Sequence, residues 1–489
     1  MKLAEFLPTD SNLEILDIMY DSRERREQSL FYCLSGLTHD GHQFAMQAVN
    51  NGAIAVVANK PLTDLPEHVV LVLVEDVEKV FYDSVAKFFN YPSRKLFVAG
   101  ITGTNGKTST AIMAHRMASK VTKSAYIGTL GVFFGEETYS YEYTTPDYVS
   151  INRYLHEMVK QGVKFCVLEA SSQGLELNRL HGIDFNAAVF TNLTHEHLDF
   201  HGSMENYYLA KKKLFENLDA EDEAIINSDD AYGQRLVEEL EIAPVTYSRI
   251  NPEADYFLKQ SETSVENSTF VLVHDDKEFN FQTDVRGEYN IDNLVDALIV
   301  VERFGMDLDK LSQTPLLIGN IEGRVDIIRE QGFPTIVVDY AHTPDGFTKI
   351  FKFAQSICPK DGDIIAVFGA AGRRDTLKRP TLGSVANEFA HRIILTEEDQ
   401  RDEKVSEINQ AIRKGITDVP NVEVFNRYEA INQAIATALP HDIILILGKG
   451  REQFNNRGAH SSDYIGDYHA VLEIIDSIKE EENKDESEH

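Results

Sequence analysis

The sequence is poor in cysteine and in basic residues, and each shortage argues against a class of protein. Its three cysteines, Cys33, Cys166 and Cys358, lie far apart and form no CxxC pair, so neither a disulfide framework nor a zinc knuckle is expected. The chain has 47 lysines and arginines against 79 aspartates and glutamates, a formal net charge of −32 over 489 residues. Because nucleic acids and anionic membranes are bound by clustered positive charge, we expect neither as a partner.

Long apolar runs are also missing. No stretch of about 18 apolar residues is present, so no segment is expected to span a membrane. The N-terminal MKLAEFLPTD lacks the apolar core behind a basic stretch that marks a secretion signal, and we expect a cytoplasmic protein. The composition, 43% hydrophobic and 26% charged, is typical of folded chains, and at roughly 100–200 residues per domain the length suggests about three domains.

The pattern of strands and turns changes along the chain. Residues 1–95 mix short apolar runs such as AIAVVA and VVLVLV with turns. A strand, a glycine-rich turn and a helical stretch from 107 to about 120 follow, and then come the buried-type strands FCVLEA and AAVFTNL. Between about 245 and 284, short alternating strands predict an antiparallel patch appended to a central sheet.

The last third of the chain predicts a second sheet. TIVVDY, DIIAVFG, HRIILT, VEVF and DIILILG are apolar runs separated by helical-length segments, which is typical of a doubly wound, largely parallel sheet. Ligands of such sheets bind beyond the carboxyl ends of the strands. Polar clusters follow four of these strands, at residues 339–342, 369–375, 396–401 and 448–452. They indicate a ligand-binding edge.

A candidate phosphate loop follows the strand KLFVAGIT and opens a helix. Its residues are Gly103, Thr104, Asn105, Gly106, Lys107, Thr108 and Ser109. Glycines let successive backbone N–H groups face one anion, and a helix N-terminus adds partial positive charge. We expect Lys107 to reach the β- and γ-phosphates and the Thr108 hydroxyl to bind Mg²⁺. Ile101 stands where the strict GxxxxGK[ST] pattern has glycine, so a glycine-rich turn without a ligand is the alternative.

Two further polar segments suggest a metal site. Glu169 ends a buried strand and His197 follows the next one, so their side chains could share a divalent cation near the phosphates. His195 and His201 crowd the same loop, which makes zinc the rival; the nearby nucleotide loop and the lack of cysteine favour Mg²⁺. A purely structural loop is the other alternative. The lysine run 211–213, taken alone, indicates no more than a solvated basic helix face.

Together the motifs resemble those of the Mur ligases. GITGTNGKTST, TTPD, LEASSQGLELNRL, NLTHEHLDFHG, YYLAKKKLF, GEYNIDN, EGRVD, VVDYAHTPDG, VFGAAGRRDTLKRPTLG and LGKGRE occur in that family's order. The segment DSRERREQSLFYCLSGLTHDGHQFAMQAVNNGAIAVV is similar to the family's UDP-binding domain, so the resemblance covers nearly the whole chain. It is strongest to the members that add the third residue of the peptidoglycan stem peptide.

The resemblance implies an α/β fold of three domains. These are a UDP-sugar-binding domain (1–95), a central P-loop ATPase domain with a mixed sheet (96–330) and a Rossmann-like, doubly wound domain for the incoming amino acid (331–489). ATP and Mg²⁺ are the implied cofactors, UDP-MurNAc-L-Ala-D-Glu and a free diamino acid are the implied substrates, and we expect a monomer. The implied reaction passes the γ-phosphoryl group to the D-glutamate carboxylate, and the amine then displaces phosphate.

The matched motifs assign roles residue by residue. Glu169 and His197 match Mg²⁺ ligands, and Lys211 matches the lysine that is carbamylated (N6-carboxylysine), which replaces the solvated-face interpretation. The residues matching muramoyl-peptide contacts are Ser22, Thr144, Thr145, Ser171 and Arg179. Those matching ATP contacts are Asn293, Arg324, Asp339 and His342. Departures from the usual pattern include Glu196, where an aspartate normally stands.

Three alternatives remain at this point. Folylpolyglutamate synthetase shares the ATPase core and the acyl-phosphate chemistry, but it lacks an N-terminal UDP domain. A nucleotide-binding regulator without activity would not need Lys211 and both metal ligands. A divergent paralogue with another substrate stays open.

The amino acid that is added depends on the third domain. Arg374 matches the arginine that pairs with the α-carboxylate, and residues 398–401, Gly448 and Glu452 match the distal end of the site. Members adding meso-diaminopimelate usually carry DNPR where this chain has Glu398, Asp399, Gln400 and Arg401. The arginine is kept, but the carboxylates suit an ammonium group, and Asp402, Glu403 and Glu398 could hold Arg401 at the surface. The sequence therefore narrowly favours L-lysine over meso-diaminopimelate.

Overall fold

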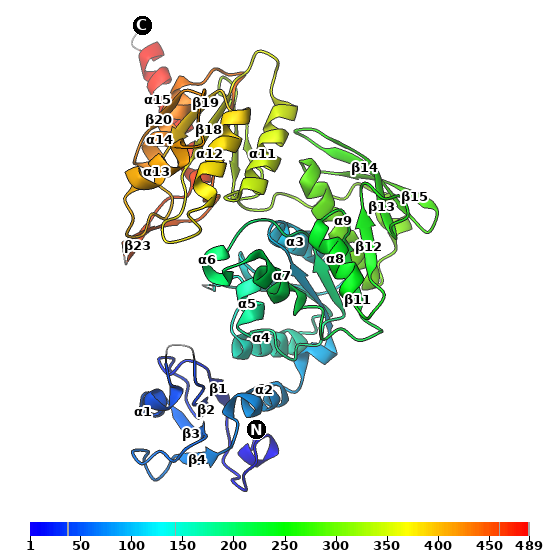
Figure 1. Ribbon diagram of the computed structural model, residues 1–489, viewed down its shortest axis with the longest axis vertical. Coiled ribbons are helices and arrows are strands. Elements are labelled where there is room, and N and C mark those ends of the chain that lie inside the picture. The colour runs from blue at the N-terminus through cyan, green and yellow to red at the C-terminus, as the bar shows by residue number, and fades with distance from the viewer. Residues whose placement is uncertain (37–38, 142, 459, 488–489) are drawn as a thin grey trace. The chain divides into compact units, whose positions relative to one another are not determined.

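The computed structural model describes residues 1–36, 39–141, 143–458 and 460–487 (Figure 1). The chain divides into two compact units. The first comprises Met1–Gly100, Ala118–Ala188 and Lys213–Glu223, and the second comprises Ile101–Met117, Val189–Lys212 and Ala224–His489. Within the described ranges, no helix is both long enough and apolar enough to cross a membrane.

The first unit begins with a small parallel sheet. Its strands, in spatial and chain order, are β1 (Asp17–Met19), β2 (Ser29–Tyr32), β3 (Ala53–Ala58) and β4 (Val70–Leu73). Met19, Phe31 and Val56 form a core with the alanines of α1 (Ala45–Asn50). Helix α2 (Val77–Phe88) starts at Asp76, whose carboxylate accepts the N–H of Lys79. Short 3₁₀ helices are η1 (Leu3–Glu5), η2 (Gly41–Phe44) and η3 (Pro92–Lys95).

The remainder of the first unit carries the strand that ends at Glu169. Its elements are β6 (Ser124–Gly128), β7 (Gly131–Phe134), β8 (Glu137–Tyr139), α4 (Tyr148–Lys160), β9 (Phe165–Glu169) and α5 (Ser172–Glu176). β6 pairs in parallel with β9 and antiparallel with β7. All five residues of β9 are buried, which explains its continuous apolar sequence.

Hydrogen bonding orders the strands of residues 97–283 as β15-β14-β13-β12-β11-β10-β5-β9-β6-β7-β8. The new strands are β5 (Phe97–Thr102), β10 (Ala187–Phe190), β11 (Glu223–Asn227), β12 (Val245–Ser248), β13 (Tyr256–Thr263), β14 (Ser268–His274) and β15 (Lys277–Thr283). The helices are α3 (Lys107–Ala118), α6 (Leu198–His201), α7 (Met204–Lys212), α8 (Ala231–Glu239), α9 (Glu288–Arg303) and α10 (Leu308–Ser312). β13–β15 are antiparallel, as predicted, whereas β12 pairs in parallel with both neighbours.

The second unit ends in the predicted doubly wound sheet, ordered β16-β17-β21-β18-β19-β20. The strands are β16 (Asp326–Ile328), β17 (Thr335–Asp339), β18 (Ile364–Phe368), β19 (Arg392–Leu395), β20 (Asn421–Glu423) and β21 (Ile443–Leu447). All pairs are parallel except β16–β17. The helices are α11 (Pro344–Ile357), α12 (Lys378–Phe389), α13 (Val405–Arg413), α14 (Arg427–Thr437) and α15 (Asp467–Ser487), and β22 (Phe454–Arg457) pairs antiparallel with β23 (His460–Asp463).

Side chains of one strand alternate between the two cores of this sheet. Ala366 and Phe368 of β18 pack in the core that includes residues of α11, α12 and α13, whereas Val367 packs with residues of α14 and α15. Both faces are therefore covered by helices, as Figure 1 shows. The predicted fold class, an α/β protein with a central mixed sheet and a doubly wound C-terminal sheet, is confirmed. The boundaries 1–95, 96–330 and 331–489 stay predictions.

Candidate active site

The loop between β5 and α3 has the backbone of an anion-binding turn. Gly103 has φ +151° and Gly106 has φ +94°, and a Cβ atom at these positions would meet Thr191 Oγ1 at 1.9 Å and Asn293 Oδ1 at 2.2 Å. Only glycine readily adopts these positive φ angles and also leaves room for the neighbouring side chains. Asn105 is held by a reciprocal pair of hydrogen bonds with Asn192, at 3.0 Å each. The loop is thus fixed by its surroundings before any anion binds.

Two lysines converge on the carbonyls of this loop. Lys107 Nζ donates to the carbonyl oxygens of Gly103 and Thr104 at 2.8 and 2.9 Å, and Lys211 Nζ donates to Gly103 O at 2.7 Å. Lys211 is 1% exposed and lies over the ring of Tyr207. Burial, together with the charge of Lys107, holds the pKa of Lys211 well below its usual range. The solvated-face interpretation of the lysine run is therefore wrong for Lys211, whereas Lys212 forms a surface ion pair with Glu239.

His197 stands in the same unit as these lysines. It has a left-handed backbone (φ +55°) and precedes α6. Burial, reinforced by Lys107, lowers the pKa of its imidazole to about 2, so the ring is neutral and a nitrogen lone pair is available to a metal. His195 contacts Asp375 and His201 stacks on Tyr207. No group of three histidine, cysteine, aspartate or glutamate side chains arranged to hold a metal ion occurs among the described residues.

Of the residues expected to contact ATP, Asn293 lies beside Gly106 and Arg324 beside Thr108, at the start of α3. Arg324 Nη2 donates to Thr108 Oγ1 at 3.3 Å, and its guanidinium lies 5.0 Å from the centre of the Tyr340 ring. Arg324 and Ser109 line a small cavity together with Asn290 and Arg286. Asn293 donates to Asn290, and the Asp339 carboxylate accepts the N–H groups of Val325 and Ala341. His342 is bonded to the carbonyl of Tyr340, and burial lowers its pKa to about 3.

Glu169 lies in the first unit, and its carboxylate is held by the turn after β6. The hydroxyl of Tyr126 and both the N–H and the hydroxyl of Thr129 donate to it. Thr129 also contacts Thr144, with 3.2 Å between the hydroxyl oxygens. Sequence reasoning missed Tyr126 and Thr129, although the polar turn after a buried strand was a usable signal. The joint use of a cation by Glu169 and His197 stays a prediction.

The same unit brings together three of the residues expected to bind the muramoyl-peptide. Thr145 Oγ1 lies 2.9 Å from Ser171 Oγ and donates to the carbonyl of Glu169, and Arg179 Nη1 donates to the carbonyl of Thr145 at 2.8 Å. Ser171 also caps α5. Ser22 lies in the loop after β1, where its hydroxyl donates to Gln47 at 2.9 Å.

The third candidate site lies at the carboxyl ends of β18, β19 and β21. Arg374 is exposed and has no bonding partner in the described part of the chain. Glu398 is 8% exposed and forms no hydrogen bond with any described residue. Burial, opposed in part by Arg427, raises the pKa of Glu398 to about 7. A Cβ at Gly448 would lie 2.1 Å from the Glu398 carboxylate, so this glycine lets the carboxyl group reach over the end of β21.

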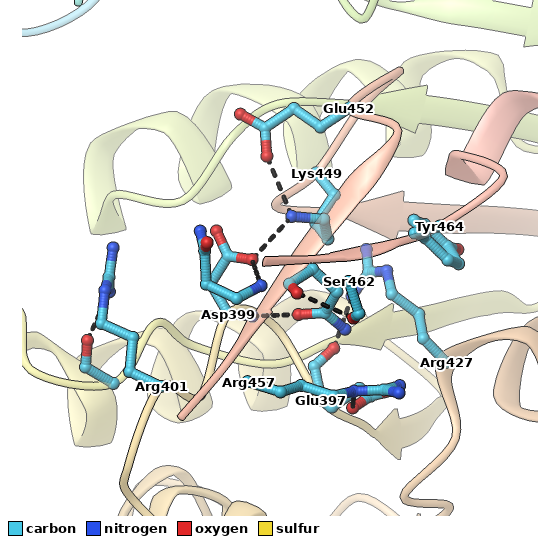
Figure 2. Close-up of polar contacts among 12 residues, drawn as sticks. Glu397, Asp399, Arg401, Arg427, Lys449, Glu452, Arg457, Ser462 and Tyr464 are labelled. Atoms are coloured by element: carbon cyan, nitrogen blue, oxygen red, sulfur yellow. Dashed lines mark hydrogen bonds and ion pairs between the residues drawn. The ribbon is translucent and has the colours of Figure 1, made fainter. Parts of the chain in front are cut away.

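Lys449 occupies the centre of this site (Figure 2). Its ammonium group is 1% exposed and donates to Asp399 at 3.0 Å and to Glu452 at 2.9 Å. Glu452 also accepts the hydroxyl of Tyr340 at 2.8 Å, and Asp399 accepts the N–H of Asn456 at 2.9 Å. Two of the carboxylates that favoured an ammonium ligand therefore share one internal cation, which offsets one of their two negative charges and which the sequence did not reveal.

Arg401 is not held at the surface by the carboxylates considered for that role. Asp402 pairs with Arg373 and Glu403 pairs with Arg379, whereas Arg401 donates to the carbonyl of Gly372. The N–H of Arg401 donates to Asn456 of β22, so this strand anchors the loop. The surface alternative is wrong in its partners, because Asp402 and Glu403 each already pair with another arginine and Glu398 forms no hydrogen bond with any described residue.

A buried arginine restrains the ends of the strands at this site. Arg427 is 1% exposed, forms a bidentate pair with Asp467 at 2.7 Å, and donates to the carbonyls of Leu447 and Glu397 at 2.8 and 3.3 Å. It thereby ties the ends of β19 and β21 to the start of α15.

Comparisons with known proteins point to one family. Residues 101–301 match the Mur ligase middle domain, and residues 323–450 match the Mur ligase glutamate ligase domain. The chain is 36% identical over 458 residues to a UDP-N-acetylmuramoyl-L-alanyl-D-glutamate–2,6-diaminopimelate ligase of Clostridium acetobutylicum, covering 93% of each chain. It is 36% identical to UDP-N-acetylmuramyl-tripeptide synthetase 2 of Oceanobacillus iheyensis, covering 92% of this chain and 93% of that protein.

A solved structure of a UDP-N-acetylmuramoyl-L-alanyl-D-glutamate–2,6-diaminopimelate ligase superposes with a TM-score of 0.66 at 29% identity, covering 98% of this chain and 99% of the other. Fold, phosphate loop and relatives together define an ATP-dependent ligase that joins an acid to an amino acid, and the predicted enzyme class is confirmed. The chain belongs to the Mur ligase family.

Proposed function

We propose that the chain is a tripeptide synthetase that joins a diamino acid to the D-glutamate carboxylate of UDP-MurNAc-L-Ala-D-Glu. The proposal is carried by relatives with this activity in their names that match over nine-tenths of the chain. ATP transfers its γ-phosphoryl group to the carboxylate and leaves ADP. The amine then attacks the acyl phosphate, loses a proton and expels inorganic phosphate. A cytoplasmic location and a monomeric state complete the proposal.

Positioned charge is the main contribution of the second unit to this reaction. The N–H groups of the 103–108 loop and the ammonium of Lys107 bind and neutralise the transferred phosphoryl group. Burial lowers the pKa of Lys211, which favours the neutral amine, the form that reacts with CO₂ to give a carbamate. Asn293, Arg324, Asp339 and His342 surround the nucleotide in this proposal.

The donor set fits Mg²⁺. Thr108 offers a hydroxyl, Glu169 a carboxylate and His197 a neutral imidazole, and a Lys211 carbamate would add anionic oxygen. This set is too small to bind Mg²⁺ alone, which fits an ion that is also held by substrate phosphates. Bound Mg²⁺ would neutralise phosphate charge during transfer.

For the amino acid, we favour meso-diaminopimelate over the L-lysine that the sequence narrowly favoured. Lys449 offsets one of the two negative charges of Asp399 and Glu452, so this pair attracts a distal ammonium less, and repels a second carboxylate less, than the sequence suggested. Among the described residues, Arg401 forms no ion pair with an acidic side chain, so it can pair with the second carboxylate of the ligand. The relatives' names point the same way.

Parallel assays of ADP release with the two amino acids test the proposal. We expect a higher kcat/KM for meso-diaminopimelate and a selective loss of that preference in Arg401→Ala. Arg413→Ala is the matched control: it removes an arginine of α13 that pairs with Glu423 of β20, and it should change neither value. A clear preference for L-lysine that Arg401→Ala leaves intact would refute the choice of amino acid. A lack of activity with both amino acids would refute the assignment as a tripeptide synthetase.

A further inference from the structure

Helix α12 and the loop before it hold the segment that ends at His197. Lys378 Nζ donates to both carboxylate oxygens of Glu196, at 3.0 and 3.2 Å. One residue earlier, His195 Nε2 lies 2.9 Å from Asp375 Oδ2, and the other oxygen of Asp375 accepts the N–H of Leu377. Two consecutive residues before His197 are thus bound by a segment that follows β18, about 180 positions away.

The Glu196–Lys378 pair lies in the interior. The two side chains are 6% and 5% exposed, whereas that of His195 is 46% exposed. A buried ion pair gains little net stability, because taking both charges out of water costs about as much as their attraction returns. Lys378 makes no further hydrogen bond within the described residues, so Glu196 is its only anchor there. Such a pair is better explained by the geometry that it imposes.

That geometry concerns His197 directly. With φ +55° and ψ +24°, His197 occupies the left-handed region, which costs a residue other than glycine about 1 kcal/mol or more and persists only where neighbours enforce it. The residue immediately before it is the one that Lys378 fixes. Glu196 has one methylene more than an aspartate would have, which lets its carboxylate reach farther toward α12.

We propose that Lys378 is a positioning residue: by binding Glu196 it holds the imidazole of His197 in its metal-binding orientation and links that orientation to the amino-acid-binding sheet. The assignment of His197 as a metal ligand comes from the proposed function, but the restraint on the loop does not depend on which amino acid is added. Residues that orient a ligand in this way typically change metal affinity by about 10- to 100-fold when removed.

The test compares Lys378→Met, Glu196→Gln and their double variant in the full chain. Mn²⁺ binding in the presence of a non-hydrolysable ATP analogue is measured by electron paramagnetic resonance, and amide exchange of residues 194–203 is measured in protein free of metal and nucleotide. We expect Lys378→Met to weaken Mn²⁺ binding about tenfold and to speed exchange of this loop. The double variant should be no worse than either single variant, because both remove the same contact.

Conservative variants separate positioning from a general loss of structure. Lys378→Arg should keep Mn²⁺ binding within about threefold of the parent, because the arginine can re-form the ion pair with Glu196. This variant also provides the test if Lys378→Met does not fold. Lys404→Met, which removes an exposed lysine paired with Glu407, is the control. Unchanged Mn²⁺ affinity and unchanged loop exchange in Lys378→Met would overturn the proposal, as would Lys378→Arg binding Mn²⁺ as weakly as Glu196→Gln. Neither readout involves the amino acid that is added. A failure of the proposed function in the activity assays can therefore be told apart from a failure of this proposal.

Discussion

Removal of the ammonium group of Lys449 tests the electrostatics of the amino-acid site. Lys449→Met keeps an unbranched apolar stem but breaks two ion pairs, of 3.0 Å to Asp399 and 2.9 Å to Glu452. Removing one member of a buried pair costs about 3–5 kcal/mol because a charge is left without a partner. Asp399 and Glu452 are 15% and 24% exposed, so water compensates in part and we expect a loss of about 2–3 kcal/mol.

Urea unfolding followed by circular dichroism measures this loss. Lys404→Met, which removes an exposed pair with Glu407, should cost no more than about 0.5 kcal/mol. Lys449→Met should also shift the ratio of kcat/KM values toward L-lysine by about tenfold, since both carboxylates become available to a distal ammonium while the second carboxylate of meso-diaminopimelate loses a nearby cation. Unchanged stability together with an unchanged ratio of kcat/KM values would refute the inference that Lys449 offsets the negative charge of Asp399 and Glu452.

Four other changes test separate parts of the structure. Lys107→Ala should lower kcat by at least about 10²-fold with an unchanged circular dichroism spectrum, because phosphate stabilisation is lost; near-normal turnover would contradict the phosphate loop. Lys211→Ala should be inactive and partly restored by a short carboxylic acid, whereas normal activity of Lys211→Arg would exclude a carbamate. The KM for the diamino acid should fall as pH rises through about 7, where Glu398 ionises, and Glu398→Gln should flatten this profile in initial-rate assays. Asp296→Ala should raise the unfolding temperature, and by more at pH 8 than at pH 4. Burial raises the pKa of the Asp296 carboxyl in the folded protein, so at pH values where this carboxyl is ionised in the unfolded chain the folded state is destabilised. A lower unfolding temperature of the variant at pH 8 would contradict this.

Features encoded by consecutive residues were predictable. The strand, glycine turn and Lys-Thr of the phosphate loop follow one another in sequence, and each apolar run of the last third became a strand. Apolar runs of this kind need no distant partner to be recognised, because burial on both faces of a parallel sheet makes them continuous.

Charge pairing across the fold was not predictable. Asp399 and Lys449 are 50 residues apart, and only the closure of the β19 and β21 ends brings them together. Counting carboxylates in one segment therefore overestimated the negative charge that a substrate meets. The burial of Lys211 had a signal in the sequence that was missed. Lys211 lies four residues after Tyr207, so both side chains lie on the same, buried face of α7, whereas Lys212 lies on another face. The contact of Glu196 with Lys378 likewise depends on tertiary packing alone.

The pairing of Arg427 with the first residue of α15 has a consequence for how the chain tolerates changes at its end. Asp467 is fully buried, so a chain cut before α15 would leave a guanidinium in the interior with only two carbonyls to bind. The ends of two strands at the amino-acid site would then lose their common restraint. Truncation, fusion or proteolysis at the start of this helix should therefore impair amino-acid selection, although the helix contributes no predicted ligand.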